Sequence, residues 1–161
     1  MGTGKLAGMN LAGTGECAAF ALRKAARAVT LLYDEALRAA GLRSTQFAIL
    51  VAVAKKQPIS VGELAELTVI EPTTMTRSLA LMAAQGLLRV GDRSTGRRKL
   101  VSLTEAGRRR LARAVPIWRA AQERLTARIG GTEWPLIRRK LERVTGHARR
   151  SPAAHRTSDR G

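Results

Sequence analysis

A chain of 161 residues is long enough for one domain with a hydrophobic core and short for two. Hydrophobic residues make up 45% of it but aromatic residues only 3%, so Leu, Val, Ile and Ala must form the core, which favours helices over a large sheet. The formal net charge is +17, and residues 89–161 carry 20 basic and 6 acidic side chains. The expected partner is therefore a polyanion, either nucleic acid or an anionic membrane.

The sequence also excludes several classes of protein. No segment approaches the roughly 18 apolar residues of a membrane span, and the N-terminus lacks a signal peptide, so we expect a cytoplasmic protein without a membrane partner. The single cysteine, Cys17, rules out an internal disulfide and a zinc-binding thiolate cluster. The two histidines, His147 and His155, lie in a polar tail, and no motif with catalytic mechanics is present. We expect no enzyme, no cofactor and no metal site.

Both ends of the chain differ in composition from the middle. Residues 1–15 hold five glycines and little that can be buried, which predicts a flexible arm, and residues 147–161 predict a disordered basic tail. A single domain is expected over 16–146. Apolar residues at spacings of three and four predict a first helix over about 16–40, ended by Gly41. Ser44 is the predicted N-cap of a second helix that ends before Pro58.

The next segments alternate short helices with a hairpin. Ser60 and Glu63 have the spacing of a capping box and predict a third helix that ends near Thr68. Pro72 suits the first position of a fourth helix, which runs to Gly86. Residues 87–90 and 99–103 resemble two strands of a hairpin with a basic tip. A long helix capped by Thr104 and a last helix over about 132–146 complete the domain.

This order of elements predicts a mainly α fold with a small β-hairpin wing. We expect a winged helix-turn-helix over about 44–103, flanked by helices over about 16–40 and 104–146. A helical wheel of the fourth helix places Met75, Leu79 and Met82 on one side. Thr73, Arg77, Ala80 and Ala84 lie on the other side, and residues 72–86 contain no acid. The predicted DNA-binding residues of this helix are Thr73, Thr74, Thr76 and Arg77.

The tip of the hairpin is the second predicted DNA contact. Arg93, Arg97, Arg98 and Lys99 lie in a narrow basic segment that suits a minor groove or the phosphates along it. A polar turn with scattered charges is the structural alternative. The basic tip comes directly after a helix that suits the major groove, and this position favours the DNA-binding interpretation.

Several stretches, in this order, resemble the MarR family of bacterial regulators over residues 17–146. They are Arg27-Ala-Val-Thr-Leu-Leu-Tyr33, Ser44-Thr-Gln-Phe47, Glu63-Leu-Ala-Glu-Leu67, Pro72-Thr-Thr-Met-Thr-Arg77, Gly86-Leu-Leu, Asp92-Arg93 with Arg97-Arg98, and Leu103-Thr-Glu-Ala-Gly107. The resemblance implies a homodimer on double-stranded DNA with a pseudo-palindromic operator. It also implies repression relieved by a small aromatic effector or by oxidation. Apolar stripes on the first and the last two helices agree with an interlocked dimer.

Two positions depart from the family pattern. Val69 occupies the turn of the helix-turn-helix, where glycine is common, and because a β-branched residue resists positive φ we expect another backbone path there. Cys17 resembles the reactive cysteine of a peroxide-sensing branch, with Tyr33 as one partner. However, it lies about half a turn too early, and Ser44 and Phe47 replace expected tyrosines. Cys17 is thus either a simple packed or exposed thiol or an oxidant sensor assisted by Arg23 and Lys24.

Three functions remain open at this point. The first is a sequence-specific transcriptional regulator, acting as a repressor that an effector releases. The second is a nonspecific architectural DNA-binding protein, for which the charge alone would suffice. The third is a winged helix that binds protein, which the acid-free face of the fourth helix disfavours. Trp118 and Trp134 are interpreted as packing residues, and no effector-binding residues are predicted.

Overall fold

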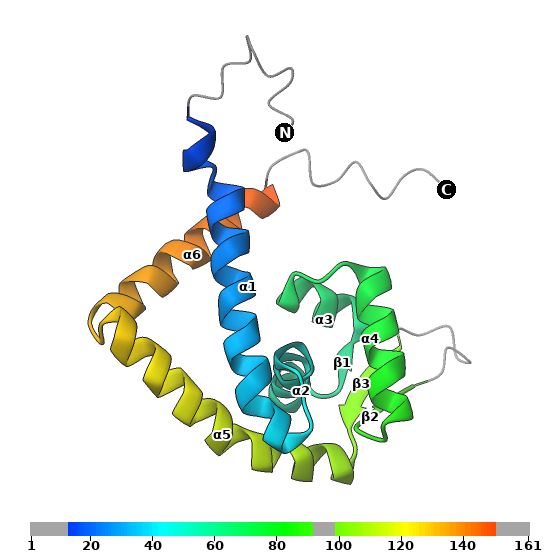
Figure 1. Ribbon diagram of the computed structural model, residues 1–161. Helices are drawn as coiled ribbons and strands as arrows, with labels where there is room; N and C mark the ends of the chain where they lie inside the picture. The colour runs from blue at the N-terminus through cyan, green and yellow to red at the C-terminus, as the bar shows by residue number, and fades with distance from the viewer. Residues whose placement is uncertain (1–12, 92–98, 151–161) are drawn as a thin grey trace, which may run out of the picture. The chain divides into compact units, whose positions relative to one another are not determined.

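The computed structural model describes residues 13–91 and 99–150, in two compact units that meet between Ile117 and Trp118. The predicted flexible arm and disordered tail lie largely outside these ranges. The first unit contains most of the elements, named here in chain order (Figure 1). They are η1 (Thr14–Glu16), α1 (Ala18–Leu37), η2 (Arg38–Ala40), α2 (Ser44–Lys56), β1 (Ile59–Ser60), α3 (Val61–Thr68), α4 (Pro72–Ala84), β2 (Leu88–Val90), β3 (Leu100–Leu103) and the first half of α5 (Glu105–Ile129). The second unit contains the rest of α5 and α6 (Glu133–Arg150).

The predicted fold class is confirmed: helices dominate, and the strands form one small antiparallel sheet. The strand order is β1-β3-β2. Strand β2 pairs with β3 as the predicted hairpin, with Leu88 opposite Leu103. Strand β1 was not expected, because it has only two residues, too few to show the alternation of apolar and polar side chains that marks a strand. It forms because Ile59 lies opposite Val101 on the free edge of β3.

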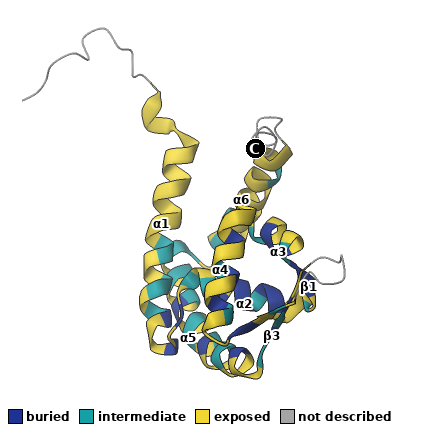
Figure 2. Cartoon of the chain, turned by 90° about the vertical axis from the view of Figure 1, so that its right-hand side faces the viewer, coloured by how far each residue is buried: buried dark blue, intermediate teal, exposed yellow. Residues whose placement is uncertain are grey.

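The core of the first unit lies between α2, α3, α4 and the sheet. Buried residues concentrate on the central α2, while most of α1 is exposed (Figure 2). The largest side chains with almost no exposed surface come from several elements; they are Leu37, Ile49, Leu50, Val53, Leu64, Met75, Leu79, Met82 and Val101. None is aromatic, as the composition required. This packing holds α4 on one side only, so its other side faces outward.

The beginning of α2 corrects the prediction that Ser44 is its N-cap. Arg43 is the N-cap, with an extended backbone, and Ser44 is the first helical residue. The Ser44 amide donates a hydrogen bond to Oδ1 of Asp34 on α1, 2.7 Å away, and the Arg43 guanidinium lies 3.6 Å from the same carboxylate. The hydrogen bond from the Ser44 amide is the main cause that lowers the pKa of Asp34. A residue ten positions away thus caps α2 and joins it to α1.

We expect Asp34→Ala to lower the free energy of unfolding by about 1 kcal/mol at neutral pH, because the Ser44 amide loses its acceptor. The folded-state pKa of Asp34 lies below the unfolded value. The carboxylate's contribution is therefore complete above about pH 4 and is lost as the pH falls through the folded-state pKa. Urea unfolding at neutral and acid pH should show the difference from wild type shrinking in acid. Asp34→Asn keeps a hydrogen-bond acceptor and should lose less stability than Asp34→Ala. If Asp34→Ala lost the same free energy of unfolding at neutral and at acid pH, the Asp34 carboxylate would not be the cap of α2.

The first turns of α5 are attached to two other parts of the first unit. The Arg110 guanidinium donates to the carbonyl oxygens of Ala40 and Gly41 at 3.3 and 3.2 Å. Thr104 caps α5 as predicted, with its hydroxyl 2.9 Å from the Gly107 amide. The Thr104 hydroxyl also donates to the Gly86 carbonyl at 2.6 Å, which ties the start of α5 to the end of α4. Because Thr104 directly follows β3 and Gly86 lies between α4 and β2, the hairpin and α4 share this anchor.

The second unit is described by itself. Helix α5 ends at Ile129, and Gly130, with φ of 114°, makes the turn that the two glycines predicted. Helix α6 begins at Glu133 and continues to Arg150, four residues beyond the predicted end. No single helix in the described ranges has the length and apolar composition to cross a membrane. One pair of helices has both when taken together: residues 18–40 and α2, which are bent by 74° relative to each other.

Candidate nucleic-acid interface

The helix-turn-helix begins with the predicted capping box. The Glu63 amide donates to the Ser60 hydroxyl at 3.2 Å, and the Ser60 amide donates to the Glu63 carboxylate at 3.0 Å. Ser60 is also part of β1, so the first turn of α3 is held by the sheet. The entry into the motif is therefore fixed by both side-chain and backbone hydrogen bonds.

The turn between α3 and α4 overturns the expected alternative path at Val69. Val69 adopts the left-handed conformation, with φ of 54° and ψ of 37°. The Ile70 amide donates to the Ala65 carbonyl at 3.0 Å, which closes the helix end in the way that a glycine usually permits. The packing of α3 against α4 prevails over the preference of a β-branched residue, so this turn is strained.

We expect Val69→Gly to raise the free energy of unfolding by about 0.5–1 kcal/mol. Relief of the left-handed strain contributes about 1–2 kcal/mol, and the greater freedom of glycine in the unfolded chain offsets part of it. Little packing is lost, because Val69 is 58% exposed. Urea unfolding measures the gain. Val69→Ala, which keeps the Cβ atom, is the matched control and should gain less; a loss on Val69→Gly would show that the turn carries no strain.

Helix α4 starts with a cap that the sequence interpretation missed. Glu71 is the N-cap, and its carboxylate accepts the Thr74 amide at 2.8 Å. Hydrogen bonds from the Thr73 and Thr74 amides lower the pKa of Glu71. Pro72 takes the first helical position, as predicted. A glutamate directly before such a proline was the available signal, but glutamate is not among the usual N-cap residues.

The two faces of α4 are those that the helical wheel predicted. Met75, Leu79 and Met82 are buried, with at most 2% of their surface exposed. The opposite face is exposed along the whole helix and consists of Thr73, Arg77, Ala80 and Ala84. In the described ranges Arg77 makes no salt bridge. This face is small, basic and free of acids.

The two flanking threonines differ in what they can offer a partner. Thr76 is exposed, but its hydroxyl donates to the Pro72 carbonyl at 2.9 Å. Thr74 is also exposed; its amide is bonded to Glu71, and its carbonyl accepts the Ser78 hydroxyl at 2.9 Å. Thr76 is therefore left with acceptor capacity, and the Thr74 side chain, like that of Thr73, lies within hydrogen-bonding reach of the Glu71 carboxylate.

The wing is described at its base. Lys99 is exposed, and its carbonyl accepts the Val61 amide at 3.1 Å, which ties the wing to the start of α3. The Gly91 amide donates to the Leu100 carbonyl at 2.8 Å across the hairpin. Residues 92–98 lie outside the described ranges, so Arg93, Arg97 and Arg98 stay predictions. Of the predicted wing contacts, the structure places Lys99 alone.

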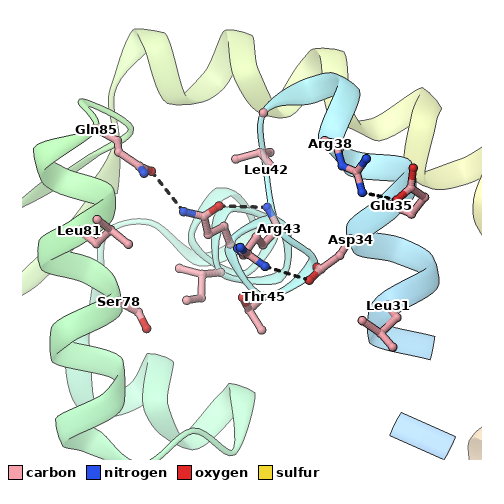
Figure 3. A pocket seen from close by; sticks show the side chains of 13 residues that line it. Leu31, Asp34, Glu35, Arg38, Leu42, Arg43, Thr45, Ser78, Leu81 and Gln85 are labelled. Atoms are coloured by element: carbon pink, nitrogen blue, oxygen red, sulfur yellow. Dashed lines mark hydrogen bonds and ion pairs between the residues drawn. The ribbon is translucent and has the colours of Figure 1, made fainter. Parts of the chain in front are cut away.

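A pocket of about 610 Å³ lies behind α4, within the first unit. Figure 3 shows Leu81 of α4 and its C-cap Gln85 on one side of the pocket and Leu31 and Glu35 of α1 on the other, with the N-terminal turn of α2 between them. Leu31 and Leu81 are each more than half exposed, and the Gln46 side chain donates to Gln85 at 3.2 Å. Sequence interpretation missed the pocket because three separate helices form it. Its remaining lining residues are Asp34, Arg38, Gly41, Leu42, Arg43, Thr45, Ile49 and Ser78.

Cys17 does not assemble a site with its predicted partner. It is exposed and stands as the N-cap of α1, whereas Tyr33 is half-buried in the same helix. Their separation of sixteen positions corresponds to about 24 Å along a helix, which excludes a contact within one protomer. Burial raises the pKa of the Tyr33 phenol. In residues 13–91 and 99–150 no three His, Cys, Asp or Glu side chains gather to hold a metal ion.

Comparisons with known proteins agree with this geometry. A model of the MarR family matches residues 40–99. The transcriptional regulator HosA of Escherichia coli O111:H- is 33% identical over 104 residues, which are 64% of this chain and 77% of HosA. The Mycobacterium tuberculosis transcriptional regulator MosR in complex with DNA is 39% identical, with a TM-score of 0.75 over 84% of this chain and 99% of MosR. A MarR family protein of M. tuberculosis in complex with salicylic acid is 25% identical, with a TM-score of 0.59 over 80% of this chain and 96% of that one.

HosA and MosR are transcriptional regulators, and the match to each of the three proteins covers more than two thirds of its length. The matched region includes the helix-turn-helix and the strands of the wing. This chain belongs to the MarR family of DNA-binding, winged helix-turn-helix transcriptional regulators.

Proposed function

We propose that this protein is a homodimeric repressor that reads a pseudo-palindromic operator with α4 and leaves it when a small effector binds. The outward face of α4 carries the proposal. It presents Thr73 and Arg77 with no acidic neighbour in the helix, beside two alanines. The arginine suits a bidentate contact with guanine, and the alanines let the helix approach the base edges closely.

The wing is proposed to hold the DNA backbone beside the base-reading helix. Its basic residues are Arg93, Arg97, Arg98 and Lys99, on a hairpin whose base is bonded to α3. Phosphate contacts fix the register of a protein on DNA but carry no sequence information. The structure of MosR in complex with DNA supports DNA as the partner of this fold.

Dimerisation is proposed from apolar side chains that each unit leaves exposed. On α1 Phe20 is 64% exposed, and on one side of α6 Leu141 and Val144 are exposed. An exposed apolar face of this kind is typical of a surface that another chain covers. We expect sedimentation to show a dimer, and Phe20→Glu or Leu141→Glu to weaken it. A monomeric wild-type protein would reject this part of the proposal.

The pocket behind α4 is the proposed effector site. Leu31 and Leu81 offer apolar surface from opposite walls, and the guanidinium groups of Arg38 and Arg43 are paired with Glu35 and Asp34. A small aromatic acid suits this pocket. Its ring can pack against the two leucines, and its carboxylate can compete with Glu35 or Asp34 for an arginine. The salicylic acid complex of a relative supports the ligand class. A ligand here touches the reading helix and so can bias its position.

One set of measurements tests this function. Genome-wide footprinting of the purified protein is expected to reveal a small number of preferred sites, and salicylate or related aromatic acids should release them. Thr45→Trp fills the pocket from α2 and should abolish the release while DNA binding persists. Ala48→Trp is the matched control, because Ala48 is an exposed residue of α2 that does not line the pocket. Footprints without preferred sites at any salt concentration would support the architectural alternative instead.

Oxidant sensing through Cys17 is the second candidate, and the exposed position of this thiol at the start of α1 is the observation that favours it. Peroxide would then weaken operator binding by the wild-type protein, and Cys17→Ser would abolish that response. An unchanged response in Cys17→Ser would reject a sensor role for this residue.

A further inference from the structure

Most of the positive charge of this protein lies away from the elements that read DNA. Helix α4 carries one basic residue and no acid, and residues 91–99 carry four basic residues and one acid. In contrast, α5 carries seven basic and two acidic residues, and α6 carries six basic and two acidic residues. The reading helix and the wing therefore account for only +4 of the net charge of +17. The charge on the last two helices requires another explanation.

On α6 the arginines form a stripe along one side of the helix. Arg139, Arg143 and Arg150 follow one another at spacings of four and seven residues, which places them within about 40° of one another around the axis. All three are exposed, as is most of the helix in Figure 2. In the described ranges none of the three forms a salt bridge. We call these three residues the α6 arginine stripe.

The rest of the helix does not neutralise this stripe. Glu142 is engaged by Arg138 at 2.6 Å, on a different flank of α6. Glu133 stands in the first turn, and Lys140 and His147 extend the stripe on one side. The stripe is about 16 Å long from its first to its last Cα atom. The phosphates of one DNA strand follow each other at about 3.4 Å along the duplex axis, so the stripe can span about five of them.

The orientation of the stripe favours a rigid polyanion over a membrane surface. Ile137, Leu141 and Val144 mark the apolar side of α6, and the stripe lies on the opposite side of the helix. A helix that lies in a bilayer interface buries its apolar side, so the side directly opposite points into water, away from the headgroups. Guanidinium groups also bind phosphate oxygens in pairs, which suits a regular row of phosphates.

We propose that the α6 arginine stripe binds the phosphate backbone of duplex DNA. The contact is independent of base sequence and adds a second DNA-binding surface to each protomer, besides α4 and the wing. It goes beyond the proposed reading of an operator, and its affinity falls steeply with salt.

The test compares two double variants of the full-length protein that remove the same charge. Arg139→Gln/Arg143→Gln removes two residues of the stripe. Arg124→Gln/Arg128→Gln is the control and removes two exposed arginines of α5 that form no salt bridge in the described ranges. Glutamine keeps a helix propensity close to that of arginine, and circular dichroism verifies folding. Binding to mixed-sequence duplexes of about 60 base pairs is measured by fluorescence anisotropy at several salt concentrations.

The stripe variant is expected to show a slope of log K against log salt that is shallower by about 0.9 for each phosphate it no longer neutralises, whereas the control variant keeps the wild-type slope. Equal reductions for both variants, or no reduction for either, would overturn the proposal.

Vesicles that contain phosphatidylglycerol provide the last arm. If the stripe variant bound these vesicles more weakly than the wild-type protein but bound the duplex equally well, the proposal would be overturned in favour of a membrane surface. A failure of the proposed operator reading is detected separately. In that case Arg77→Ala would leave base preference unchanged, while the stripe variant would still show a reduced salt dependence of DNA binding.

Discussion

Gly107→Ala is expected to lower the free energy of unfolding by about 1–3 kcal/mol, the range for a side chain forced into a packed site. A Cβ atom on Gly107 would lie 2.0 Å from the carbonyl oxygen of Leu87 and 3.0 Å from its carbonyl carbon. Both atoms belong to the backbone, so no side-chain rotation can make room. The gain in helix propensity, about 1 kcal/mol for Gly to Ala, offsets only part of this strain.

The Leu87 carbonyl lies where α4 ends and the wing begins. It accepts the Thr104 amide at 3.2 Å, and the Leu87 amide donates to the Met82 carbonyl of α4 at 3.0 Å. Displacing Leu87 therefore disturbs the anchor that the reading helix and the hairpin share. We expect weaker DNA binding in addition to lower stability, measured by urea unfolding and by fluorescence anisotropy.

Gly62→Ala is the matched control for this substitution. Gly62 is the second residue of α3, and a Cβ atom there would meet nothing within 4 Å. The same change should therefore stabilise the protein by about 0.5–1 kcal/mol through helix propensity. If Gly107→Ala proved as stable as Gly62→Ala, the close approach of α5 to Leu87 would be wrong.

Arg77→Ala is expected to reduce discrimination at one base pair of each half-site by about 1–3 kcal/mol, or roughly 5- to 150-fold in relative affinity. The physical reason is the loss of a bidentate donor from the middle of the outward face of α4. Competition between the operator found by footprinting and single-base variants of it measures the change. The folded state should be unaffected, because Arg77 is exposed and makes no salt bridge in the described ranges.

Arg97→Ala provides the contrast. As a predicted phosphate ligand of the wing, Arg97 should contribute equally on every sequence, so its removal weakens binding to all duplexes alike and reduces the salt slope by about 0.9 for each phosphate that Arg97 neutralises. Unchanged base preference in Arg77→Ala, together with altered base preference in Arg97→Ala, would exchange the two roles and reject the assignment of α4 as the reader.

Local sequence patterns were sufficient for the order of the helices and for the two faces of α4. The Ser60–Glu63 capping box, the proline at the start of α4 and the spacing of Met75, Leu79 and Met82 depend on residues within one or two turns of each other. Hydrogen bonds and periodicity over such short distances are the same in any fold that contains the segment. The face of α4 that carries Arg77 was therefore predictable from these residues alone.

The features that sequence interpretation missed or misplaced arise between segments that are far apart in the chain. Asp34 caps α2 from another helix, β1 exists because β3 offers it an edge, and the pocket needs walls from α1, α2 and α4. Val69 accepts a left-handed conformation because the packing of α3 against α4 compensates for its strain. The backbone preference of a single residue is worth about 1 kcal/mol, whereas the burial of several core side chains is worth several kcal/mol. Tertiary packing therefore decides the local conformation wherever the two conflict.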